Sequence, residues 1–179
     1  MGNLNINSKT TYITKGGIYV ALSLVILYAS VLVPFNTMFI LLLASSIIPL
    51  SILTIGIKPT IIVYFAVSSI SYFIIPTKSI CIMYLLFFGS YGFIKYFIEG
   101  NKNRNLQILF KFLFFNASAI IYLFLLKTLF ATGVSITYNN NIVLLITPII
   151  IYEVAFFIYD YALTQIITYL SKKVIKNLK

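Results

Sequence analysis

Ionisable side chains inside apolar segments are the first candidates for chemistry, because a charge in lipid is costly and usually has a function. Lys127 lies near the end of an apolar run over residues 106–131, and Asn116 falls on the same stripe of that run at helical spacing. Glu153 and Asp160 are seven residues apart in the next apolar run, so they share a helix face about 10 Å apart. Such side chains can bind a polar ligand, or they can neutralise one another between helices.

Two interpretations of these residues remain open. If consecutive helices are antiparallel neighbours, Lys127 meets Glu153 in one half of the membrane, and Asp160 meets Lys95 and Lys111 in the other. In the functional interpretation, Lys127 and Glu153, with the asparagine below them, form a polar pocket that opens to the outside. In the structural interpretation, both sets are ion pairs that join helices. The structural interpretation is favoured for Asp160, since charges near a helix end can reach the interface along their apolar stems.

Catalysis is not predicted. The chain has no histidine, which removes the commonest general base and transition-metal ligand. Its single cysteine, Cys81, lies in an apolar run and can form neither an internal disulfide nor a thiolate metal cluster. No phosphate-binding glycine loop or nucleophile elbow is present. We therefore expect a protein that binds, moves or assembles something, which is not an enzyme and needs no cofactor and no metal.

The elements that must position these residues are transmembrane helices. The chain of 179 residues is 61% hydrophobic and 9% charged, whereas a soluble domain averages about 45–50% apolar and about 25% charged residues. A helix needs about 20 apolar residues to cross the hydrocarbon layer. The sequence predicts an all-α, polytopic membrane helical bundle of about six transmembrane helices, a single domain over residues 1–179. The predicted spans are 15–34, 37–56, 59–75, 79–99, 106–131 and 142–170.

The distribution of cations predicts that both termini are cytoplasmic. Of the 13 lysines and arginines, only Lys78 and Lys127 fall on the outer side if the N-terminus is inside. The cations that then fall on the inner side are Lys9, Lys15, Lys58, Lys95, Lys102, Arg104, Lys111, Lys172, Lys173, Lys176 and Lys179. This bias and the anionic lipid surface explain the net charge of +10, so nucleic acid is not a predicted partner.

Aromatic and small residues in the fourth predicted span allow two roles. Tyr84, Tyr91 and Lys95 share one face, which could stack on a planar ligand, although packing between helices is favoured. Gly89 and Gly92 indicate close helix contact, because small residues let backbones approach each other in a membrane.

The segment KGGIYVALSL, residues 15–24, opens the first span, and six short-looped helices with both ends inside follow in fewer than 200 residues. This arrangement resembles the substrate-capturing S component of an energy-coupling factor (ECF) transporter. In that family a small-xxx-small stripe of the first helix packs against the transmembrane coupling subunit. Here Gly17 and Ala21 take these positions, although the usual pair is two alanines.

The resemblance implies uptake of a vitamin or micronutrient. The ligand would bind from the outside, beneath the outer loops, while separate coupling and ATPase subunits in a bacterial cytoplasmic membrane supply the energy. Family ligands usually contact the last three helices and the outer loops, which here contain Asn36, Lys78, Tyr84, Asn116, Lys127, Asn139 and Glu153. The chain lacks tryptophan, a common stacking platform, which argues against a large aromatic vitamin.

The alternative is a non-transporting assembly protein. Small rod-shape-type proteins of the cell-wall machinery have a similar size and topology and act through helix–helix contacts. An outward pocket with several convergent polar groups would favour capture. A sealed outer face in which Lys127 and Glu153 are fully paired would favour assembly.

Overall fold

The computed structural model describes residues 3–101, 103–130 and 142–177. All elements in these ranges are helical, so the predicted all-α bundle is confirmed. The helices are α1 (Asn3–Leu32), α2 (Thr37–Ile55), α3 (Ile57–Ile74), α4 (Lys78–Met83), α5 (Gly89–Glu99), α6 (Arg104–Phe130) and α7 (Ile142–Asn177). A 3₁₀ turn, Pro34–Asn36, precedes α2, and a π-helical turn, Tyr84–Phe88, joins α4 to α5.

Five segments are long and apolar enough to cross a membrane. They are Thr10–Leu32, Thr37–Ile55, Ile57–Ile74, Lys78–Glu99 and Arg104–Leu129. These bounds agree with the first five predicted spans to within a few residues, and the sixth predicted span lies inside α7. The chain is therefore a multi-pass helical membrane protein.

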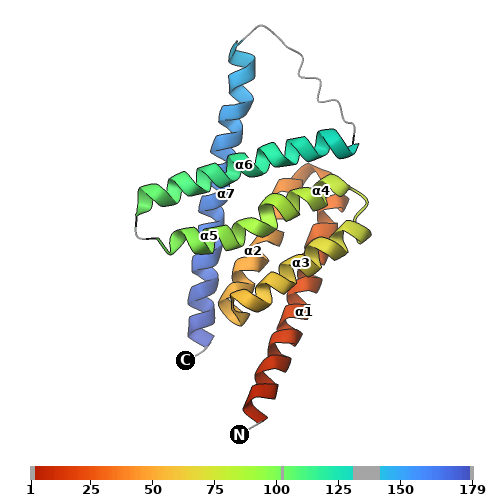
Figure 1. Cartoon of the computed structure of the whole chain (residues 1–179), viewed down its shortest axis with the longest axis vertical. Helices are drawn as coiled ribbons and strands as arrows, with labels where there is room; N and C mark the ends of the chain where they lie inside the picture. Colours follow the sequence, from red (N-terminus) through yellow and green to blue (C-terminus); the bar gives the residue numbers. More distant parts are fainter. Residues whose placement is uncertain (1–2, 102, 131–141, 178–179) are drawn as a thin grey trace.

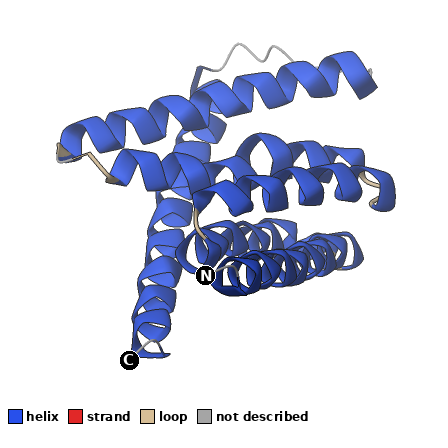
Figure 2. Ribbon diagram, turned by 60° about the horizontal axis from the view of Figure 1, so that its bottom comes forward, coloured by secondary structure: helices blue, strands red, loops and turns tan. Residues whose placement is uncertain are grey.

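The start of α1 and the end of α7 lie at the same end of the molecule (Figure 1). The helix formed by α4 and α5 lies beneath α6, and both cross α7 at a steep angle (Figures 1 and 2). The assumption that α6 and α7 are antiparallel neighbours is therefore wrong. The C-terminal end of α6 leads away from α7 in both views, because α6 packs along the π-helical turn and α5.

Helices α2 and α5 approach each other at Gly92, where α5 has no side chain. A Cβ at this position would lie 2.8 Å from Cγ2 of Ile48 and 3.1 Å from Cδ of Pro49. Pro49 lies inside α2 and is buried. The role in close packing that the sequence suggested for Gly92 is confirmed.

The π-helical turn is held from α3 by Tyr64. The Tyr64 hydroxyl donates a hydrogen bond of 2.7 Å to the Leu85 carbonyl inside this turn. The ring of Tyr64 occupies the space beside Gly89, where a Cβ would lie 2.8 Å from the ring atom Cε2. π-helical turns are rare and often occur at functional sites, and the other side of this turn faces a cavity.

Candidate functional site

A cavity of about 290 Å³ lies between α2, the π-helical turn, α6 and α7. Its walls are almost entirely apolar, and eight of its lining residues are aromatic. Helix α2 and the segment Met83–Phe88 contribute Met38, Phe39, Leu42, Met83, Leu86, Phe87 and Phe88. Helices α6 and α7 contribute Phe115, Ser118, Ala119, Tyr122, Tyr152, Ala155, Phe156, Ile158 and Tyr159.

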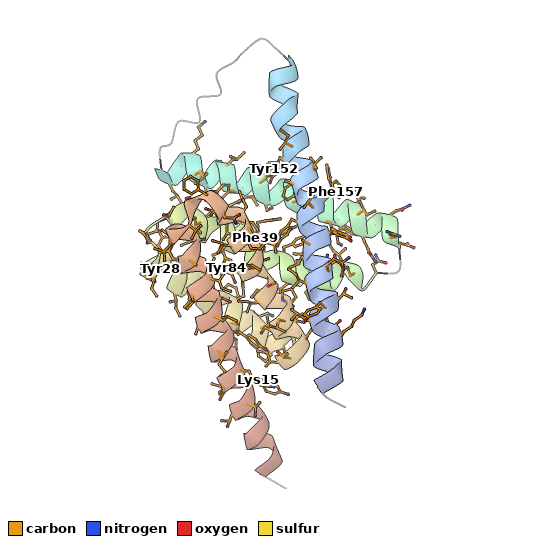
Figure 3. The ribbon with its side chains drawn as sticks, turned by 180° about the vertical axis from the view of Figure 1, so that it is seen from behind. Lys15, Tyr28, Phe39, Tyr84, Tyr152 and Phe157 are labelled. Atoms are coloured by element: carbon orange, nitrogen blue, oxygen red, sulfur yellow. The ribbon has the colours of Figure 1, made fainter. Side chains whose placement is uncertain are left out.

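Stacked aromatic rings at the crossing of α6 and α7 form part of the wall of this cavity. The Phe115 ring of α6 stacks on Tyr152 and Phe156 of α7, with centroids 4.3 and 4.2 Å apart. Phe87 of the π-helical turn packs edge-on against Phe115 at 5.3 Å. Tyr152 lies where α7 passes α6 (Figure 3). All four of these rings line the cavity.

Beyond these rings, four charged side chains form one ion cluster: Lys95 and Glu99 of α5, Lys111 of α6 and Asp160 of α7. Lys95 pairs with Asp160, and its Nζ lies 3.0 Å from Oε1 of Glu99. Nζ of Lys111 lies 2.8 Å from the same Glu99 oxygen and 3.0 Å from Oδ2 of Asp160. Two cations and two anions thus balance one another while they join three helices.

Polar neighbours complete the ion cluster. The Tyr91 hydroxyl donates to Oδ1 of Asp160 at 2.7 Å, and Lys95 donates to Oγ1 of Thr164 at 2.7 Å. Lys95 is only 1% exposed, and Lys111 is 9% exposed. Buried lysines at this depth require paired carboxylates, because an unpaired buried charge is strongly destabilising.

The predicted pairing of Asp160 with Lys95 and Lys111 is confirmed. Sequence reasoning missed the contribution of Glu99 to this cluster. The signal was present, since Glu99 follows Lys95 by four residues, a spacing that places both on one helix face. Tyr91, whose face was considered for ligand stacking, instead packs against other rings and is fully buried.

The predicted polar pocket is not assembled around the cavity. Within the described part of the chain, Lys127 is exposed and forms no ion pair with Glu153. Glu153 is half-buried, and its Oε2 has no hydrogen-bond partner among the described residues. The Asn116 amide donates to the carbonyl of Phe112, in its own helix, at 3.0 Å. The divergence of α6 from α7 separates Lys127 from Glu153.

The remaining predicted ligand contacts also lie away from the cavity walls. Asn36 is exposed at the end of the 3₁₀ turn. Tyr84 is fully buried, and its ring lies beside Gly89 on the side of Tyr64. Asn139 lies outside the described residues. Sequence reasoning missed the cavity-lining residues because their apolar side chains are of the same types as those that face lipid.

The α1 positions predicted to contact a partner subunit are exposed. A Cβ at Gly17 would meet no atom within 4 Å, and Ala21 on the same face is also exposed. The neighbouring Gly16 faces the bundle instead, where a Cβ would lie 3.5 Å from Val63 of α3. The stripe of Gly17 and Ala21 is therefore exposed.

Together, these features define a multi-pass helical membrane protein with a ligand-sized apolar cavity between its helices. Comparison of the chain with protein-family models, curated proteins and solved structures finds no match.

Proposed function

We propose that this protein is the substrate-capturing membrane subunit of an ECF-type vitamin or micronutrient uptake transporter. It binds its ligand from the outer side of a bacterial cytoplasmic membrane and relies on separate coupling and ATPase subunits. The observation that carries the proposal is the cavity of about 290 Å³, whose walls include stacked aromatic rings that lie next to the ion cluster. Ligand pockets are typically mostly apolar, and this cavity lies near the lower end of their size range, about 300–1,000 Å³.

The order of residues along three helices supports an outward cavity. In the segment from α4 to α5, the cavity residues Met83–Phe88 precede the ion-cluster residues Lys95 and Glu99. On α7 the cavity residues likewise precede Asp160. On α6, which crosses in the opposite direction, Lys111 precedes the cavity residues, so the cavity lies toward the same end of the bundle on all three helices. With the cation bias placing the termini inside, the ion cluster lies toward the cytoplasm and the cavity toward the outside. Such an arrangement puts the balanced ion cluster between the cavity and the cytoplasm.

Filling the cavity tests ligand capture. Ala119→Phe places a ring in the cavity from α6, so we expect retention of the native ligand to fall at least tenfold. The matched control is Ile120→Phe, because residue 120 adds a ring on the same helix but is 68% exposed. The measurement is mass spectrometry of small molecules that co-purify with the tagged protein from its native host. Equal retention by both variants would contradict ligand capture in this cavity.

Larger side chains on the exposed face of α1 test whether this face contacts a partner subunit. The double substitution Gly17→Leu and Ala21→Leu removes the close approach that small residues allow between helices. We expect co-purification of the coupling subunit and its ATPases to fall at least tenfold, with the thermal stability of the isolated chain unchanged. Ser69→Leu, at an exposed position of α3, is the control for added bulk. Undiminished recovery of the ATPases with the double variant would remove this face from the contact.

The exposed face of α1 also suits the second candidate, a non-transporting assembly protein that acts through helix contacts. The same co-purification separates the two functions. Membrane partners of wall synthesis without ATPases, and no metabolite sensitive to Ala119→Phe, would favour assembly over transport.

A further inference from the structure

We propose that the ligand is an uncharged, lipid-soluble molecule of about two rings, and that it enters the cavity sideways from the bilayer. This inference rests on the proposed function, because it concerns the ligand of the same cavity. It narrows the substrate from a vitamin or micronutrient in general to one chemical class.

The cavity walls offer no charge to a ligand. Among the described residues, none of those that line the cavity is charged. The nearby ion cluster is internally balanced, since Lys95 and Lys111 are already paired with Glu99 and Asp160. A charged ligand would lose its hydration without gaining a counter-ion, which costs several kcal/mol or more. The walls therefore select an uncharged molecule.

Few polar groups in the walls remain for the ligand. The Ser118 hydroxyl donates to the Phe115 carbonyl at 2.8 Å, and the Tyr159 hydroxyl donates to Ser45 at 3.0 Å. Within the described part of the chain, no hydrogen bond involves the hydroxyls of Tyr122 and Tyr152. These two groups suit a ligand with one or two polar atoms on an otherwise apolar body.

The size and the composition of the cavity limit the number of rings in the ligand. An apolar protein cavity of about 150 Å³ stays dry and binds one benzene ring. At about 290 Å³, this cavity has room for about two such rings. Its aromatic walls favour rings in offset or edge-on contact, and Met38 and Met83 can adapt to an irregular outline. A large aromatic vitamin does not fit this volume.

The mouth of the cavity is part of the lipid-facing surface. Among the lining residues, Met38 is 62% exposed, Phe39 53% and Ile158 64%. All three are apolar, and Met38 and Phe39 belong to α2, which is long and apolar enough to cross a membrane. Further exposed apolar residues, Val154 and Phe157, continue this surface along α7. A molecule dissolved in the bilayer can reach the cavity through this mouth without crossing a polar rim.

The test uses the absence of tryptophan from the chain. Phe39→Trp places a single tryptophan at the mouth, and Phe73→Trp, at an 84% exposed position of α3, is the control. Both variants are reconstituted in lipid nanodiscs with one of two probes that share a ring system. 5-Dimethylaminonaphthalene-1-sulfonamide is uncharged, and 5-dimethylaminonaphthalene-1-sulfonate carries a sulfonate, while both have only two fused rings. Energy transfer from tryptophan to the probe is measured, and Met38→Trp replaces Phe39→Trp if the latter does not fold.

We expect energy transfer from the mouth tryptophan to the uncharged probe to saturate, with a dissociation constant at least tenfold lower than that of the sulfonate. This saturable transfer should be lost when Ala119→Phe is added. The control tryptophan should report only non-saturable partition of the probe into the bilayer. Saturable, Ala119→Phe-sensitive binding of the sulfonate at equal or higher affinity would overturn the ligand class but leave ligand capture intact. If neither probe binds in an Ala119→Phe-sensitive way, capture by this cavity fails as well.

The route by which the ligand enters the cavity is tested by fluorescence quenching of the mouth tryptophan. Brominated phosphatidylcholine quenches tryptophan that faces acyl chains, whereas iodide quenches tryptophan that faces water. We expect brominated lipid to quench the mouth tryptophan at least threefold more effectively than iodide. Stronger quenching by iodide would overturn entry from the bilayer, whatever the ligand class proves to be.

Discussion

Asp160→Asn is expected to lower the free energy of unfolding by about 3–5 kcal/mol, because it removes one of the two carboxylates that neutralise buried lysines. Lys95, at 1% exposed, loses its ion pair on α7 and retains only Glu99 on its own helix. Lys111 loses its ion pair with α7. The substitution nearly preserves side-chain shape, so the effect reports on charge. A thermal unfolding midpoint lowered by about 10 °C in detergent is the corresponding measurement.

The matched control is Glu153→Gln on the same helix. Glu153 is a half-buried carboxylate without an ion pair in the described part of the chain. Its neutralisation should change stability by no more than about 1 kcal/mol. Adding Lys95→Met to Asp160→Asn should recover part of the loss, since the unpaired charge then disappears. Equal unfolding midpoints for Asp160→Asn and Glu153→Gln would contradict the ion cluster.

Gly92→Ala is expected to lower the free energy of unfolding by about 1–3 kcal/mol, the usual cost of overpacking a tight contact. The added methyl group would lie 2.8 Å from Cγ2 of Ile48 and 3.1 Å from both Cβ of Ile48 and Cδ of Pro49. Neither the β-branched isoleucine nor the proline ring can turn aside easily, so α2 and α5 must separate. The expected readout is a lower unfolding midpoint.

Gly17→Ala separates the packing effect at Gly92 from the general effect of replacing a helical glycine. A Cβ at Gly17 meets no atom within 4 Å, so this substitution should be neutral or stabilising by up to about 1 kcal/mol through helix propensity. The two variants are therefore expected to shift the midpoint in opposite directions. A Gly92→Ala protein as stable as Gly17→Ala would mean that α2 and α5 do not approach as closely as described.

The ion cluster also accounts for how a chain with so few anions tolerates lysines inside the bundle. The sequence has three acidic residues against 13 basic ones, and two of the three belong to the cluster. The excess of cations lies in loops and tails, where water and lipid headgroups solvate it.

Local features of the sequence were sufficient to predict the transmembrane helices. Hydropathy over about 20 residues depends only on neighbouring positions, so the five span bounds agree with the structure to within a few residues. The pairing of Asp160 with Lys95 and Lys111 was also predictable, because charges within a bundle must find partners and these three lie at similar depths.

The candidate site, in contrast, was decided by tertiary structure. The wall residues Phe39, Ala119 and Phe156 are of the same types as side chains that face lipid, so composition cannot distinguish a cavity wall from an outer surface. The separation of Lys127 from Glu153 follows from the crossing of α6 over α7, which no spacing within one helix encodes. The sequence by itself determined which segments span the membrane and which charges must pair, since both follow from the energetics of lipid. Only packing between helices determined the crossing angles, and these created the cavity.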